Sequence, residues 1–348
     1  MENNHYQNTQ PSSKTNFFIK VLNSYLAKQQ DITNQLLLQR KDFIKICKQS
    51  LEVHSFLERI PVTKLSSDES LLHAYVLFSR VHLLSKNIMR DIKRKEKPSF
   101  WDYTSMCINA RSLIEAVEML FHIYLEDVSN DERSLRLIYQ QLRNSKYYIK
   151  NFESGINSKD ITQDQNYVLK AAIDSIEETA NRLIEKANSN EFYKRLAEDN
   201  TEPCLDLKKS KSFQDEYLKQ KRFHVEKKMQ VVDSITYIHL YHELSFFVHP
   251  YDISSDPKCA ISRTQKEISD LKMRHASSAL SHSILYLRYA AANIIHKLIL
   301  NDISDLFIKK ELDKFRDILR DLQSTPHSLP LAKELKLVNI GQMPNNQH

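Results

Sequence analysis

The sequence contains only two glycines, Gly155 and Gly341, among 348 residues. Phosphate-binding loops, dinucleotide-binding turns and tight β-hairpins need glycine, because glycine alone adopts positive φ freely and lets a phosphate or a second backbone come close. Strict alternation of apolar and polar residues is also absent over any useful length. These two absences argue against the ordinary nucleotide-binding folds and against a β-sheet.

Long uncharged runs and paired cysteines are missing as well. No stretch of about 18 residues is free of charge, so we expect no membrane-spanning helix. The polar N-terminus has no apolar segment of the kind that a signal peptide requires. No C-x-x-C occurs, and the four cysteines show no paired spacing (Cys47, Cys107, Cys204 and Cys259). This pattern predicts reduced thiols in a cytoplasmic protein.

Apolar residues recur with helical periodicity along nearly the whole chain. We therefore expect an all-α fold, a multi-helix bundle of about ten helices with no sheet. Capping boxes are expected at Ser66-x-x-Glu69 and Ser129-x-x-Glu132, and Asp102 or Ser99 is expected near the start of another helix. The predicted organisation is a disordered N-terminus (1–13), a long N-terminal helix (14–64), a bundle core (65–301) with a surface loop (198–213), a C-terminal helix (302–323) and a flexible tail (324–348).

Four ionisable residues lie on one side of a predicted helix at residues 106–125, which is otherwise almost entirely apolar. At 100° per residue they fall within a sector of about 60°. We call them the polar seam: Arg111, Glu115, Glu118 and His122. One interpretation is a stripe facing solvent or a gap between helices, with Arg111 and Glu115 paired at i,i+4. The other is a buried acid/base cluster, whose charges must be paired, shifted in pKa or used in chemistry.

A second predicted helix, at residues 234–250, is also apolar nearly all round. Tyr241, Ser245 and His249 share one of its faces, and His249 is at the helix C-terminus because Pro250 follows it. Helix carbonyls there favour a protonated imidazole, whereas burial favours a neutral one.

Metal binding is poorly supported by the motifs. His242-Glu243 begins like the H-E-x-x-H zinc motif, but Phe246 stands where the second histidine belongs. His239 and His242 are spaced to hold a metal, although lone histidines on apolar helices are more often core residues. Glu118 and His122 are four positions apart, so they do not form the Glu-x-x-His element of di-metal bundles. We expect no metal and no cofactor.

The chain is mildly basic, with a net charge of +6 and a pI near 8.9. Basic runs occur at residues 90–97, 208–211 and 219–228, with aromatic residues nearby. Such runs are either solvated faces or a footprint for nucleic acid, in which aromatic rings stack on unpaired bases.

Two segments together resemble a known group of proteins. A-R-S-L-I-E-A at 110–116 and Y-H-E-L-S-F-F-V-H-P at 241–250 are similar to a bacterial family of all-helical uncharacterised proteins, loosely grouped with HEPN-like domains. The resemblance covers roughly residues 65–300. It implies a helical bundle associated with antiviral defence or toxin–antitoxin systems, and a metal-independent ribonuclease that uses an Arg-x(4–6)-His motif. This chain departs from that motif, because seven residues separate both Arg274 from His282 and Arg288 from His296.

If that activity carries over, the resemblance implies a split catalytic site made of Arg111, Glu115 and His249. Histidine would act as general acid or base, and arginine would stabilise the phosphate charge. The expected substrate-binding residues are Glu118, His122, Tyr241 and Ser245, with RNA as substrate. The alternative hypothesis is a non-catalytic helical module that binds a protein partner or a second copy of itself, with the polar seam in a structural role.

Overall fold

The computed structural model of the chain describes residues 13–93, 97–98, 101–158, 161–199, 228–229, 231, 244 and 265–324. Within these residues there are nine α-helices and no strand, so the predicted all-α fold is confirmed. Helical periodicity without glycine or β-type alternation produces this result, because each amphipathic helix buries its apolar side against other helices.

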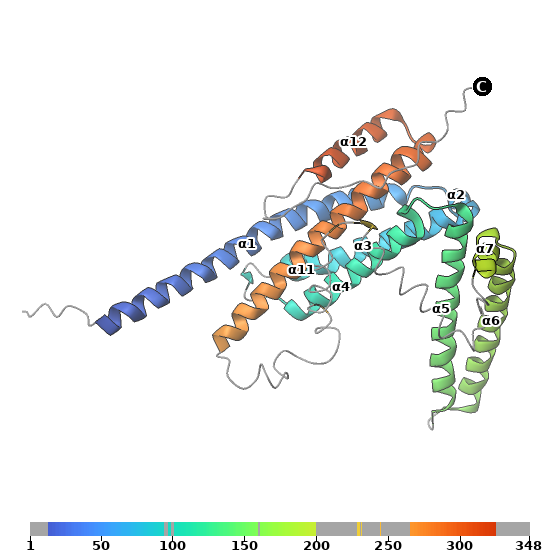
Figure 1. The fold of residues 1–348 in the computed structure, drawn as a ribbon, viewed down its shortest axis with the longest axis horizontal. Coiled ribbons are helices and arrows are strands. Elements are labelled where there is room, and N and C mark those ends of the chain that lie inside the picture. The colour runs from blue at the N-terminus through green and yellow to red at the C-terminus, as the bar shows by residue number, and fades with distance from the viewer. Residues whose placement is uncertain are drawn as a thin grey trace, which may run out of the picture.

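Four helices form the main bundle: α1 (Ser13–Leu57), α3 (Glu69–Lys93), α4 (Tyr103–Leu120) and α11 (Gln265–Asn293). In Figure 1 they lie alongside one another, and α1 packs on α3, α3 on α4, α4 on α11 and α11 on α1. Their facing sides supply most of the main hydrophobic core, which includes Phe43, Phe78, Leu113 and Leu287. The short α2 (Val62–Ser67) connects α1 to α3.

Contacts between helices fix their directions. α3 is antiparallel to α1, because Ser50 near the end of α1 meets His82 and Cys47 one turn earlier meets Ser85. α4 and α11 are parallel instead. Cys107, near the start of α4, contacts the carbonyl of His275, and the segment that follows α4 contacts the segment that follows α11. The ends of α4 and α11 therefore meet at the same end of the bundle.

Both of these helices end in a π-helix. α4 continues into η2 (Phe121–Leu125), and α11 continues into η4 (Ile294–Asp302). After the short 3₁₀-helix η5 (Ser304–Leu306), α12 (Lys309–Gln323) packs on the outside of the bundle. Phe315 of α12 inserts next to Phe56 of α1, with ring centroids 4.4 Å apart.

A helical hairpin projects from this end of the bundle (Figure 1). It consists of α5 (Asn130–Ile156) and α6 (Gln163–Asn188), with α7 (Glu191–Asp199) packed at its base. The base has a small core of its own, containing Leu135, Tyr139, Ala187 and Tyr193. Near the tip, Gly155 lets the two helices approach closely, because a Cβ at this position would lie 3.2 Å from Leu169 Cδ1.

Two of the expected helix starts are confirmed and one is wrong. The Asp102 side chain accepts a hydrogen bond from the Ser105 amide at 3.0 Å, and the Ser129 hydroxyl accepts one from the Glu132 amide at 3.1 Å. Ser66, by contrast, lies inside α2. The carboxylate of Asp68 caps α3 instead, 3.0 Å from the Leu71 amide, because this carboxylate stands directly before the helix and accepts from its first amides.

Candidate functional site

The polar seam is divided between a partly exposed half and a buried half. Arg111 Nε lies 3.3 Å from Glu115 Oε1, and these two side chains are 15% and 33% exposed. Glu118 and His122, one and two turns further along, are 5% and 6% exposed. Burial therefore increases along the seam, and a role of its buried half in acid/base chemistry stays a prediction. The Arg111–Glu115 pair lies at the edge of the bundle, and Glu118 and His122 face its interior.

The other predicted site residues cannot be placed. Tyr241, Ser245 and His249 lie outside the described residues, as do His239 and His242. Leu244, which is described, is 1% exposed and belongs to the main core. The convergence of Arg111 and His249 on one pocket stays a prediction.

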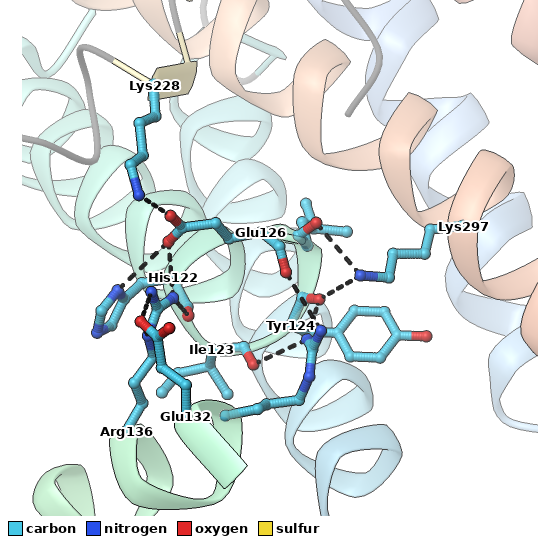
Figure 2. Close-up of polar contacts among 10 residues, drawn as sticks. His122, Ile123, Tyr124, Glu126, Glu132, Arg136, Lys228 and Lys297 are labelled. Atoms are coloured by element: carbon cyan, nitrogen blue, oxygen red, sulfur yellow. Dashed lines mark hydrogen bonds and ion pairs between the residues drawn. The ribbon is translucent and has the colours of Figure 1, made fainter. Parts of the chain in front are cut away.

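The buried end of the seam adjoins a larger cluster of charged residues, which we call the junction cluster: Glu126, Glu132, Arg133, Arg136, Lys228 and Lys297. Its centre is Arg136 of α5, whose side chain is fully buried. The guanidinium donates to Glu126 Oε2 at 2.6 Å and to Glu132 Oε1 at 2.5 Å (Figure 2). Glu126 accepts a further hydrogen bond from Lys228.

The same cluster satisfies the carbonyl groups at the end of η2. The last carbonyls of a helix have no partner within the helix, and they carry partial negative charge. Arg136 donates to the His122 carbonyl at 2.6 Å, and Arg133 donates to three others, those of Ile123, Tyr124 and Glu126. Figure 2 shows Arg136 beside this helix end.

Lys297 reaches this helix end from the opposite side. It comes from η4, and its Nζ donates to the carbonyl oxygens of Tyr124 at 2.8 Å and Leu125 at 3.3 Å. The ammonium also lies 5.2 Å from the centroid of the Tyr124 ring. The Tyr124 hydroxyl in turn donates to Asp302 at the end of η4. The two π-helices are thus joined by hydrogen bonds for which each of them supplies a donor.

Burial and pairing set the protonation of these groups. Burial raises the pKa of the Glu126 carboxyl, but hydrogen bonds from Arg136 and Lys228 outweigh it and hold the pKa below its usual range. Burial lowers the pKa of the Arg136 guanidinium, but the carboxylates of Glu126 and Glu132 raise it by more. The pKa therefore lies above its usual value, and the guanidinium stays charged. Burial, with the nearby Arg133 charge, lowers the pKa of Lys297 to about 8.

The arrangement of the junction cluster is that of a helix cap. Its cations point at carbonyl oxygens and carboxylates of the protein itself, and these bonds connect α5 and η4 to the end of α4. Buried charges arranged in this way have their hydrogen bonds within the protein. We therefore interpret the cluster as the attachment of the hairpin to the bundle.

Only a weak signal in the sequence points to this cluster. Glu132 and Arg136 are spaced i,i+4 directly after the capping residue Ser129, which is also the pattern of an ordinary solvent-exposed pair. Arg133 and Lys297 show no motif at all.

A second polar cluster lies between α1 and α3. The imidazoles of His54 and His82 are stacked, with centroids 4.9 Å apart, and Ser50 Oγ lies 3.2 Å from His82 Nδ1. His82 is 4% exposed, and its Nε2 has no hydrogen-bond partner among the described residues. Burial, with the nearby His54 and Lys86, lowers the pKa of His82 to about 4. This histidine is therefore neutral near pH 7.

Comparisons of the chain with protein-family models, with curated protein sequences and with solved structures find no match. Within the part of the chain that the structure describes, no helix combines the length and the apolar character that crossing a membrane requires.

Proposed function

We propose that this protein is a non-catalytic helical interaction module, in which the bundle holds the α5–α6 hairpin out toward a protein partner. The observation that carries the proposal is the exposure of large apolar and aromatic side chains on the outer half of the hairpin. Tyr148 of α5 and Val168 of α6 are 51% and 63% exposed. Tyrosine is enriched in protein–protein interfaces, because its ring supplies apolar area and its hydroxyl still hydrogen bonds.

The packing of the hairpin supports the same role. All buried residues of α5 lie between Arg133 and Leu142, in its first half, and those of α6 are Ala180 and Ala187, in its second half. The base of the hairpin is thus packed, whereas the apolar residues further out, such as Ile149 and Ile173, are only half-buried. Two helices on their own leave much of each apolar stripe in water, and a partner would cover it.

The junction cluster supports a fixed orientation for the hairpin. Arg136 and Arg133 bind the carbonyls at the end of η2 from the first turns of α5, and Lys186 near the end of α6 lies 2.8 Å from Glu69 of α3. A preorganised binding surface avoids the entropic cost of ordering it on association.

Photo-crosslinking tests this proposal. A photoreactive amino acid is placed at position 148 or, as the control, at position 182, because the Arg182 side chain is 68% exposed on the same hairpin. We expect discrete crosslinked protein species from position 148 in the producing cells and in concentrated purified protein, and none from position 182. Absence of any crosslinked protein from position 148, or equal yields from both positions, would overturn the proposal.

The ribonuclease hypothesis is the second candidate. The observation that favours it is the Arg111–Glu115 ion pair, in which the carboxylate orients a guanidinium of the kind that binds phosphate. A cleavage assay on single-stranded RNA, comparing the wild type with Arg111→Ala and His249→Ala, tests it. Cleavage that both substitutions abolish would support the catalytic set of Arg111, Glu115 and His249. Cleavage that survives both would count against it.

A further inference from the structure

The two sides of the α5–α6 hairpin differ in charge. Ile149 of α5 lies on the same line as the buried Leu142, and Ile173 of α6 lies on the same line as the buried Ala180, so both isoleucines mark where the helices meet. Tyr148 and Ala172 each precede one of them by one position. Each step of one position along an α-helix rotates the side chain by 100°. In two antiparallel right-handed helices, the residue one position before the contact line therefore lies on the same side of the hairpin in both helices.

Among the described residues of α5 and α6, that side carries no charged side chain in the outer half of the hairpin. We call it the uncharged face, and its six central residues are Ser145, Tyr148, Phe152, Val168, Ala172 and Ile176. Their spacings of three and four positions give one continuous stripe on each helix. The rings of Tyr148 and Phe152 pack together, with centroids 6.4 Å apart.

The opposite side is charged. Lys150 and Asp174 each follow a contact isoleucine by one position, and Lys146 and Lys170 lie on the same side. Tyr167 belongs to this charged stripe, three positions before Lys170. The hairpin therefore has one face suited to water and one that is suited to burial but remains partly exposed.

We propose that a second copy of this chain covers the uncharged face, so that two hairpins pack face to face as an antiparallel four-helix bundle; this inference rests on the proposed interaction function. A twofold interface places the same surface patch of both copies in contact. A patch with charge of one sign would repel the same patch on the other copy. The uncharged face creates no such repulsion, and its burial removes no charged group from water. Aromatic residues at its centre, Tyr148 and Phe152, suit the core of such an interface.

The size of the face predicts how tightly the copies bind. The outer half of each helix is about four turns long, or roughly 20 Å, and two neighbouring helices are together about 20 Å wide. Such a footprint lies at the small end of specific interfaces, where complexes are weak and transient. We expect a dimer that dissociates in the micromolar range.

Sedimentation velocity from about 1 to 200 µM tests the inference with the full chain. The wild type shifts from monomer to dimer over this range. Tyr148→Glu, which introduces a charge at the centre of the uncharged face, weakens the dimer at least about tenfold. Val168→Glu, on the second helix of the same face, does the same.

Tyr167→Glu is the matched control, because it makes the same substitution at an exposed tyrosine on the charged side of the same hairpin. It leaves the monomer–dimer transition unchanged. The inference is overturned if the wild type stays monomeric up to 200 µM, or if Tyr167→Glu weakens the dimer as much as Tyr148→Glu. A monomeric wild type that still forms crosslinks from position 148 to a protein of different mass would overturn the second copy as occupant and leave the interaction function standing.

Discussion

Lys297 donates a hydrogen bond from Nζ to the carbonyl oxygen of Tyr124, 2.8 Å away, although 173 positions separate the two residues in the sequence. Each residue belongs to a π-helix, and each π-helix follows a long helix of the main bundle. The contact joins η2, which follows α4, to the first half of η4 at the point where the hairpin begins. It thereby explains how a mostly apolar bundle accommodates a partly buried lysine, since the ammonium replaces its lost hydration with carbonyl oxygens.

Removing the buried guanidinium of Arg136 should strongly destabilise the protein. Arg136→Met keeps an apolar chain of similar length but removes the guanidinium donor from the carbonyl of His122 and from the carboxylate of Glu126, which retains Lys228. Breaking one partner of a buried ion pair typically costs about 3–5 kcal/mol of the free energy of unfolding. Urea denaturation measures the change. The control is Arg182→Met, which removes an exposed i,i+4 pair with Glu178 and should cost less than about 0.5 kcal/mol. Equal stability of the two variants would contradict the structural role of the junction cluster.

A second buried arginine holds the end of α12. Arg288 of α11 donates to the carbonyl of Leu322 and, at 2.8 Å, to that of Gln323, both in the last turn of α12. Arg288→Leu should lower the free energy of unfolding by about 2–4 kcal/mol, because it removes a cationic cap from buried carbonyls. In the variant, backbone hydrogen exchange should accelerate relative to the wild type more in α12 than in α3. Arg320→Leu, at a side chain 76% exposed on α12 itself, should leave that exchange unchanged. Protection of α12 that survives Arg288→Leu would show that apolar contacts alone hold this helix.

The histidine cluster between α1 and α3 predicts a loss of stability in acid. Burial, His54 and Lys86 lower the pKa of His82 from 6.5 to about 4, so the unfolded chain binds a proton at a higher pH than the folded one. The stability contributed by neutral His82 is present above pH 6.5 and is lost as the pH falls from 6.5 to 4. The loss reaches up to about 3 kcal/mol.

His82→Asn tests this origin, because asparagine can still hydrogen bond with Ser50 but does not titrate. The variant should lose less stability than the wild type between pH 7 and pH 4, as measured by urea denaturation at each pH. Parallel curves for His82→Asn and the wild type would assign the acid sensitivity to other groups.

Much of the fold was predictable because its signals are local. The helical period of apolar residues predicted the all-α class. Short polar side chains at the expected helix starts predicted caps such as Asp102 and Ser129. The cap at Ser66 was predicted wrongly because Asp68, two positions later, also suits a helix start, and spacing alone does not decide between them.

For the candidate site, the sequence determined that Arg111, Glu115, Glu118 and His122 share one side of a helix, since 100° per residue fixes that relation without any partner. Only the tertiary structure decided that this seam is partly exposed at Glu115 and buried at His122, because burial depends on which helices pack against α4 and how far along it they reach. The junction cluster was decided in the same way. Lys297 reaches the end of η2 from a segment distant in the chain, whereas Arg136 comes from the next helix. A linear pattern carries no information about which of such donors will fill a helix end.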